Sequence, residues 1–141
     1  MFLKISKNII EEEAKALLSL SKSLDTNYNK VLSLIARAKG NIILSGVGKS
    51  GHIARKIAST LTSTGTPAYF IHPTEASHGD LGAIRKKDIL CLLSKSGKSK
   101  ELLDLLNFAN ENNIISILIS NNKKSKLAQL SSYNLIIPNI K

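Results

Sequence analysis

The sequence has a single cysteine, no tryptophan and few aromatic residues, which make up 4% of its 141 residues. One cysteine cannot form an internal disulfide, which favours a reducing compartment. No apolar run approaches the roughly 20 residues that a membrane-spanning helix needs. The N-terminal residues also lack the apolar core and cleavage site of a secretory signal. We therefore expect a cytoplasmic protein that makes no membrane contact.

Acidic residues are scarce as well. Ten aspartates and glutamates stand against 20 lysines and arginines, for a formal net charge of +10. Such an excess attracts anions, and nucleic acid is the first to consider. Only three of the basic residues are arginines, and the lysines are not interleaved with aromatic residues. Because base readout favours arginine forks and single-strand binding favours aromatic platforms, we expect an anionic metabolite and no nucleic acid.

The composition that remains, 43% apolar and 21% charged residues, is that of one globular domain. Residues 1–39 follow a helical rhythm that breaks at Asp25-Thr26-Asn27, which predicts two helices. Strands and helices then alternate in a domain that covers 40–141. Strands are expected at 42–47, 67–71, 88–94, 114–120 and 134–138, and helices at 51–63, 99–112 and 124–131.

The third and fourth of these strands are almost wholly apolar, as Ile-Leu-Cys-Leu-Leu at 89–93 illustrates. Parallel strands that are covered by helices on both faces have this composition. We therefore predict an α/β fold, a three-layer sandwich around a five-stranded parallel sheet. A flavodoxin-like strand order, 2-1-3-4-5, would bring the turns after strands one and three side by side, where such sheets bind ligands.

Those two turns carry the strongest functional signal in the sequence. Residues 46–51 read Gly-Val-Gly-Lys-Ser-Gly, residues 94–99 read Ser-Lys-Ser-Gly-Lys-Ser, and each set stands between a predicted strand and a predicted helix. A glycine-bent turn that leads into a helix N-terminus offers backbone N–H groups and a positive dipole end to an anion. Hydroxyls and lysines add to this, so the pair predicts a phosphate site.

The first turn has two other interpretations. Gly46, Gly48 and Gly51 match the dinucleotide-binding pattern G-x-G-x-x-G, but the second strand ends without the acidic residue that would hold a ribose. A tight turn without a ligand explains the glycines and leaves Lys49 and Ser50 unexplained.

In the second turn, Ser94, Ser96 and Ser99 can present three hydroxyls to phosphate oxygens, with Gly97 letting the backbone approach. Alternatively, Ser99 only caps the helix that follows. Glu101 falls in the first turn of that helix, where an acid commonly complements the dipole.

The histidines and the cysteine carry weaker signals. His72 and His78 bracket a polar connection between strands two and three, with a spacing that matches no zinc pattern, so we expect no metal. A histidine there can contact a sugar hydroxyl or shuttle a proton. His52 is expected to pack or cap, and Cys91, among leucines in a strand, to be a small buried side chain.

Two longer runs identify a family. Residues 46–67, G-V-G-K-S-G-H-I-A-R-K-I-A-S-T-L-T-S-T-G-T-P, and residues 72–82, H-P-T-E-A-S-H-G-D-L-G, closely resemble the arabinose-5-phosphate isomerases of the sugar isomerase (SIS) domain superfamily. The Ser94–Ser99 turn resembles the serine-rich phosphate loop of that superfamily. The likeness spans 40–138 and implies a flavodoxin-like sheet.

The resemblance also implies an activity, the interconversion of ribulose 5-phosphate and arabinose 5-phosphate through an enediolate, which needs no cofactor and feeds the eight-carbon acid sugar of lipopolysaccharide. Lys49 and Glu101 fall at positions implicated in catalysis, and His78 falls in a segment that lines the site. From the needs of the reaction, we expect Glu101 to be the base, Lys49 to face the oxyanion, and His78 to be a ligand or proton relay. Phosphate contacts are expected from Ser50, Ser94, Ser96 and Ser99, with Gly48 and Gly97 in the same turns.

The chain departs from the family pattern in two places. Lys95 and Lys98 stand in the serine-rich turn where close relatives carry asparagine and glutamate, which adds positive charge beside the phosphate. The family also continues past the fifth strand with further active-site residues and a covering helix, so we expect a C-terminally incomplete domain. Either it isomerises a pentose phosphate as a homo-oligomer assembled through residues 1–39, or it is a non-catalytic sugar-phosphate-binding module or an inactive fragment.

Overall fold

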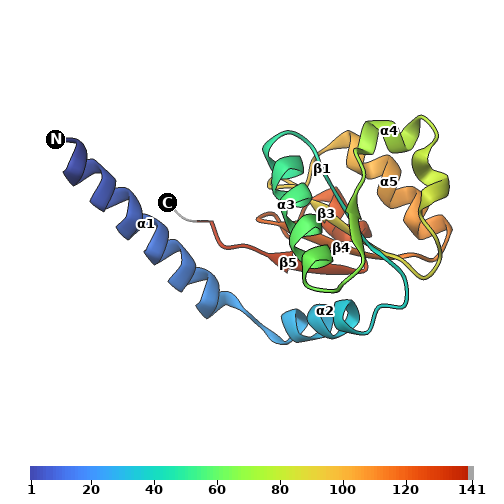
Figure 1. The fold of residues 1–141 in the computed structure, drawn as a ribbon, viewed down its shortest axis with the longest axis horizontal. Coiled ribbons are helices and arrows are strands. Elements are labelled where there is room, and N and C mark those ends of the chain that lie inside the picture. The colour runs from blue at the N-terminus through green and yellow to red at the C-terminus, as the bar shows by residue number, and fades with distance from the viewer. Residues whose placement is uncertain (140–141) are drawn as a thin grey trace.

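Five strands form a single parallel sheet in the order β2-β1-β3-β4-β5 (Figure 1). The computed structural model describes residues 1–139. The strands are β1 Ile42–Gly46, β2 Ala68–Phe70, β3 Ile89–Leu93, β4 Ile115–Ser120 and β5 Tyr133–Ile136. The predicted strand order and parallel orientation are confirmed.

Helices cover both faces of this sheet and complete the predicted three-layer sandwich. The helices are α1 Phe2–Ser23, α2 Thr26–Ala36, α3 Lys49–Ser63, α4 Pro73–Ser77, α5 Lys100–Glu111 and α6 Lys126–Leu130, with a 3₁₀ turn at Asp80–Ala83. Of these, α2 and α3 lie on one face, and α4, α5 and α6 on the other.

Two hydrophobic cores result, because side chains alternate across the sheet along every strand. In β3, Ile89 and Cys91 point to the α2 and α3 side, while Leu90 and Leu92 point to the α5 side. All five residues of β3 are buried. Burial on both faces explains why the strand reads as a continuous apolar run.

The two N-terminal helices differ sharply. The first ends at Ser23, and Asp25 caps the second, since its carboxylate accepts hydrogen bonds from the backbone N–H groups of Asn27 and Tyr28 at 2.9 and 3.3 Å. Helix α2 packs on the sheet through Val31, which is fully buried. Helix α1 has no buried residue and projects away from the body of the domain (Figure 1).

Several element bounds shift by one or two residues from the sequence-based expectation: α3 starts at Lys49, two residues before the expected 51, and β5 ends at Ile136, two residues before the expected 138. Helix α6 spans five residues, shorter than the expected 124–131. The polar connection after β2 contains α4, which begins at Pro73 and is capped by His72, whose Nδ1 accepts a hydrogen bond from the Thr74 N–H at 3.3 Å. A helix this short has no apolar periodicity to detect.

Among residues 1–139, no helix is both long and apolar enough to cross a lipid bilayer.

Candidate functional site

The turn between β1 and α3 is shaped by its glycines. Gly48 has a φ of +58°, a left-handed conformation that residues with a side chain rarely adopt. A Cβ at Gly51 would lie 2.6 Å from the carbonyl oxygen of Gly46, so α3 can cross the end of β1 only with glycine there. As a result α3 starts at Lys49, and its N-terminal N–H groups, which have no partners within the helix, face the carboxyl edge of the sheet.

The turn between β3 and α5 is held by its serines. Ser94 is buried, and its hydroxyl accepts a hydrogen bond from the Gly97 N–H at 3.2 Å. That hydroxyl also lies 3.1 Å from the Ser99 hydroxyl. Ser99 occupies the N-cap position of α5 but makes no side-chain cap hydrogen bond. Capping alone therefore does not account for Ser99, whose hydroxyl is directed into the turn.

The same turn is anchored to the segment that follows β4. The Lys95 carbonyl accepts hydrogen bonds from the Ser120 hydroxyl at 3.0 Å and from the Asn121 N–H at 3.1 Å. Gly97, with a φ of +67°, lies against Ser125, whose side chain a Cβ at Gly97 would overlap. The backbone of the turn is thus fixed before any ligand arrives.

Both turns open onto one cavity of about 450 Å³, which we call the carboxyl-edge cavity. Lys49 and Ser50 line it from α3, and Ser94 and Lys95 line it from the second turn. Apolar side chains form much of its remaining wall: Ile53, Leu93, Ile119, Ile137 and Pro138. The structure therefore brings the two turns that the sequence singled out to one place.

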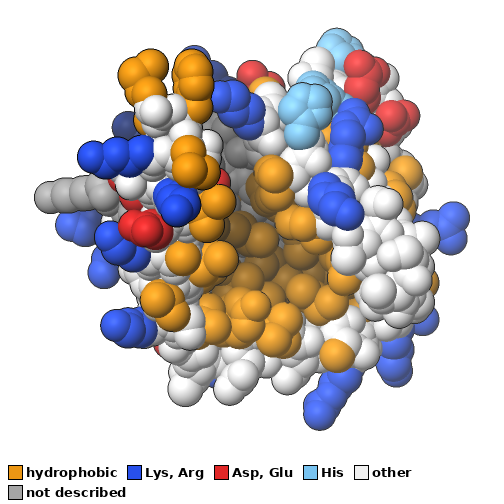
Figure 2. Space-filling view, turned by 60° about the vertical axis from the view of Figure 1, so that its left-hand side comes forward, with side chains coloured by type: hydrophobic (Ala, Val, Ile, Leu, Met, Phe, Trp, Pro, Cys, Tyr) orange, Lys and Arg blue, Asp and Glu red, His pale blue; other side chains and the backbone are white. Residues whose placement is uncertain are grey.

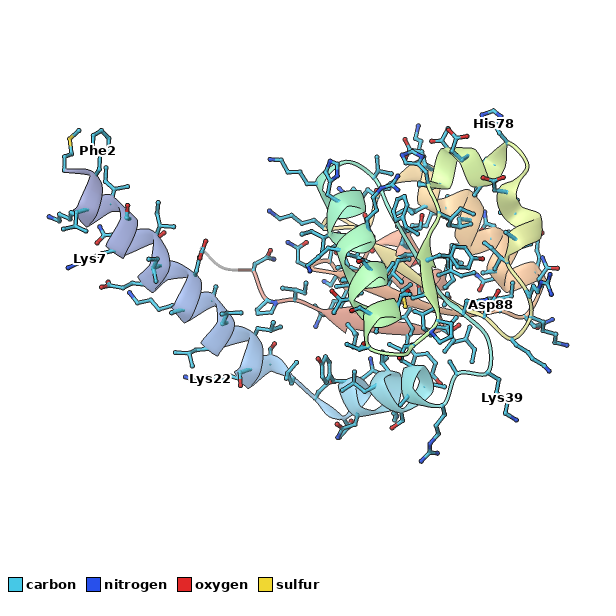
Figure 3. All side chains as sticks on the ribbon, in the orientation of Figure 1. Phe2, Lys7, Lys22, Lys39, His78 and Asp88 are labelled. Atoms are coloured by element: carbon cyan, nitrogen blue, oxygen red, sulfur yellow. The ribbon has the colours of Figure 1, made fainter. Side chains whose placement is uncertain are left out.

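Other site residues predicted from the sequence lie farther out. Ser96 belongs to the second turn but is exposed, and its hydroxyl accepts a hydrogen bond from the Lys98 N–H at 3.3 Å. Glu101 is exposed in the first turn of α5. His78 is exposed at the C-terminal end of α4 and points outward (Figure 3). None of these three is among the described residues that line the cavity.

The cavity is also lined by two asparagines that were not predicted from the sequence. Asn121 follows β4, and Asn139 follows β5. Their side chains are hydrogen-bonded to each other at 2.7 Å. The carboxyl ends of all parallel strands meet at one edge, so a polar residue directly after β4 was the available signal.

Charge at the cavity comes from the ammonium groups of Lys49 and Lys95, and no carboxylate lies among the described residues that line it. Within residues 1–139, no three side chains of the metal-binding types His, Cys, Asp and Glu gather closely enough to hold an ion. Cys91 lies in the middle of β3, where burial raises the pKa of its thiol to about 12. That thiol is a core side chain, as the sequence predicted, and not a nucleophile.

Comparison with known proteins places these features in a family. The SIS domain model matches residues 34–139. The arabinose 5-phosphate isomerase KpsF of Escherichia coli O6:H1 is 52% identical over 128 residues, which cover 87% of this chain and 38% of the relative. Protein RP505 of Rickettsia prowazekii is 43% identical over 134 residues, covering 95% of this chain and 42% of the relative. This chain thus spans about two fifths of the length of these relatives.

A solved structure shares the fold closely. The structure of E. coli CFT073 c3406 in complex with arabinose 5-phosphate superimposes with a TM-score of 0.91 at 35% identity. The alignment covers 99% of this chain and 74% of that protein.

Proposed function

Because the chain belongs to the SIS domain family, we propose that its carboxyl-edge cavity binds the phosphate of a phosphorylated sugar and that the domain isomerises that sugar. The observation that carries the proposal is the meeting of two glycine-serine turns at one cavity. Ser50 and Ser94 offer hydroxyls there, and Lys49 offers a cation. Hydroxyls and helix N-terminal N–H groups donate hydrogen bonds to a phosphate dianion, and a cation in the same cavity attracts an anionic substrate.

The reaction we propose is the one named for the KpsF relative, the interconversion of ribulose 5-phosphate and arabinose 5-phosphate. From the ketose, a base removes a proton from C1, and the electron pair forms an enediolate with negative charge on O2. The proton of the O1 hydroxyl passes to O2 and the base returns its proton to C2, which leaves an aldehyde at C1 and a hydroxyl at C2. The product would be a precursor of cell-envelope sugars.

Lys49 is the residue best placed for this chemistry. It lines the cavity next to Ser50, so its ammonium group can face the oxyanion while the serines hold the phosphate. We propose Glu101 as the base and His78 as a proton relay on the resemblance to the family. A base must come within about 3 Å of the proton that it removes. Glu101 and His78 are exposed and do not line the cavity, so these two roles require contacts beyond those of the single chain.

Turnover of ribulose 5-phosphate tests the proposal. We expect arabinose 5-phosphate above a protein-free control, and Lys49→Gln should lower kcat/KM about 100-fold, as removal of an oxyanion donor does. Lys56→Gln is the matched control, since Lys56 is an exposed lysine on the same helix. Absence of product from the wild-type protein, or an equal loss in both variants, would contradict the proposal.

The exposure of Glu101 and His78 favours one alternative, a module that holds the sugar phosphate without converting it. Calorimetry with arabinose 5-phosphate separates the two functions, because a binding module gives saturable heat and no product. In either case Ser50→Ala and Ser94→Ala should each weaken binding about tenfold, the loss of one hydrogen bond to a charged group. Ser59→Ala, an exposed serine farther along α3, should leave the affinity unchanged.

We also propose that α1 joins copies of this chain into a homo-oligomer. Its apolar side chains repeat at a spacing of seven residues, and Leu3, Ile10 and Leu17 are each more than 60% exposed. Figure 2 shows apolar side chains gathered in a hollow, and a groove between α1 and β5 is lined by Leu17, Leu20 and Leu135. Apolar side chains that gather uncovered on one surface mark an interface with another protein. Sedimentation should show an oligomer for the wild-type protein and a monomer for Leu17→Glu. The control variant Glu12→Gln should remain an oligomer. A monomeric wild-type protein would refute the proposed role of α1.

A further inference from the structure

A second cavity lies at the opposite end of the strands from the site described above. It has a volume of about 670 Å³ and lies between α2 and the first residues of β3, β4 and β5. We call it the amino-edge cleft. The strands β3 and β4 connect the two sites, since Ile89 and Ile115 line the cleft while Leu93 and Ile119 line the carboxyl-edge cavity. A ligand in one does not occupy the other.

The rim of the cleft is strongly basic. Five cations line it, from α2, from the loop after α2 and from the loop before β3: Lys30, Arg37, Lys39, Lys86 and Lys87. Among its described lining residues the single carboxylate is that of Asp88. Like charges that are gathered on one surface repel one another, and they do so more strongly beside a protein than in bulk water. A fold that gathers them without matching acids is suited to an anion.

Asp88 holds the two basic loops together. Its side chain is 3% exposed, and its oxygens accept hydrogen bonds from the backbone N–H groups of Asn41 and Arg85, both at 2.7 Å. Gly40 lies so close to the Lys87 carbonyl that a Cβ there would overlap it. The segments that carry Lys39 and Lys87 therefore meet in a fixed arrangement, and Figure 3 shows Lys39 and Asp88 at this edge. Because these carboxylate oxygens are hydrogen-bonded within the fold, their capacity to pair with the rim cations is reduced.

The cleft also has an apolar surface. Leu34 on α2, Ile89 and Ile115 at the starts of their strands, and the half-buried ring of Tyr133 line it. A bare phosphate or a small sugar phosphate makes no use of such a surface. A ligand with a flat apolar ring and several negative charges uses both the surface and the rim. Cavities of 300–1,000 Å³ hold ligands of that size.

From the basic rim, the locked loops and the apolar surface, we propose that the amino-edge cleft binds a nucleoside polyphosphate. The phosphates contact the lysines of the two loops, and the base lies against Tyr133. The proposal is independent of the isomerase activity, because it involves no residue of the carboxyl-edge cavity.

Calorimetry on the full chain with ATP and with UTP, in EDTA, tests the proposal. We expect saturable binding of one nucleotide per chain, unchanged by saturating arabinose 5-phosphate. Lys86→Gln combined with Lys87→Gln should weaken the affinity about fivefold or more, as the loss of two charge contacts predicts. The matched control combines Lys123→Gln with Lys124→Gln, which removes the same charge from exposed positions outside the cleft.

Several outcomes would overturn the proposal. They are absence of nucleotide binding, equal weakening by the control pair, displacement of ATP by arabinose 5-phosphate, and binding of tripolyphosphate or a 12-residue RNA as tight as that of ATP. The last would mean that the cleft responds to charge alone. Tyr133→Leu adds a second readout, since it should weaken the binding of ATP and leave that of tripolyphosphate unchanged. If the double lysine variant fails to fold, Lys39→Gln replaces it and should weaken ATP binding about twofold.

Discussion

The two edges of the sheet carry cavities of different construction. At the carboxyl edge, hydroxyls and backbone N–H groups come from two short turns, and the charge is that of Lys49 and Lys95. At the amino edge, five cations surround an apolar surface, and a buried aspartate ties the loops that carry four of them. One edge is shaped by backbone conformation, the other by side-chain charge.

This difference determines how each site responds to mutation. A site made of turn geometry is sensitive to any residue that needs a different backbone conformation, even one far from the ligand. A site made of long, exposed lysines tolerates single changes, because each contributes little by itself. In that site the most sensitive residue is Asp88, the buried aspartate that holds the two loops together.

The largest effect should come from Gly97→Ala at the carboxyl edge. The left-handed φ and the overlap with Ser125 together should lower the free energy of unfolding by about 4 kcal/mol, and sugar-phosphate binding should be lost. Urea denaturation and calorimetry measure the two effects. Gly82→Ala is the control, since a Cβ there meets nothing within 4 Å. Adding Ser125→Gly to Gly97→Ala removes the overlap, so the double variant should regain only the part of the lost stability that the overlap caused. Full recovery would show that the positive φ of residue 97 does not destabilise alanine there.

At the amino edge, Asp88→Ala should destabilise the domain by about 3 kcal/mol, because it removes the buried acceptor of the backbone N–H groups of Asn41 and Arg85. Nucleotide binding should fall with it, while the affinity for arabinose 5-phosphate changes less than about twofold, since the other edge keeps its contacts. Asp104→Ala, at an exposed position on α5, provides the control. Loss of both affinities together would mean that the two edges are not independent.

Between the two edges, the burial of Cys91 in the core can be tested by measuring how stability depends on pH. The pKa of the Cys91 thiol is raised from 9.0 to about 12, so between these values the unfolded chain binds fewer protons than the folded one. Stability is therefore lost as pH rises above 9, by about 1.4 kcal/mol per unit from this group. In Cys91→Ala the loss is absent, so its stability deficit relative to wild type should narrow between pH 8 and pH 10. Urea midpoints that fall in parallel would contradict this.

The smallest effect should be that of Ser96→Ala. Its hydroxyl is exposed and accepts one hydrogen bond from Lys98, so its loss should weaken sugar-phosphate binding by about threefold, less than the loss of Ser94. Calorimetry on the two variants side by side gives the ranking. An unchanged affinity in Ser96→Ala would remove Ser96 from the proposed phosphate site.

Much of the fold was predictable because its signals are local. The break at Asp25, the apolar run of β3 and the order of strands and helices were all predicted and are found. The short helix after His72 was not predicted, because five residues cannot display a period. At the candidate site, the two turns could be predicted from their glycines and serines, whereas Asn121 and Asn139 gain their place only from the alignment of strand ends.

By itself the sequence determined the backbone of the two turns and the alternation of buried strands with helices. These depend on a residue and its near neighbours: on whether a side chain permits a positive φ, and on which faces are apolar. Only the tertiary structure decided that Ser50 and Ser94 share a cavity and that the lysines at 30, 39, 86 and 87 surround another. Such gatherings depend on strand order and on where each crossover returns, and no stretch of adjacent residues encodes these.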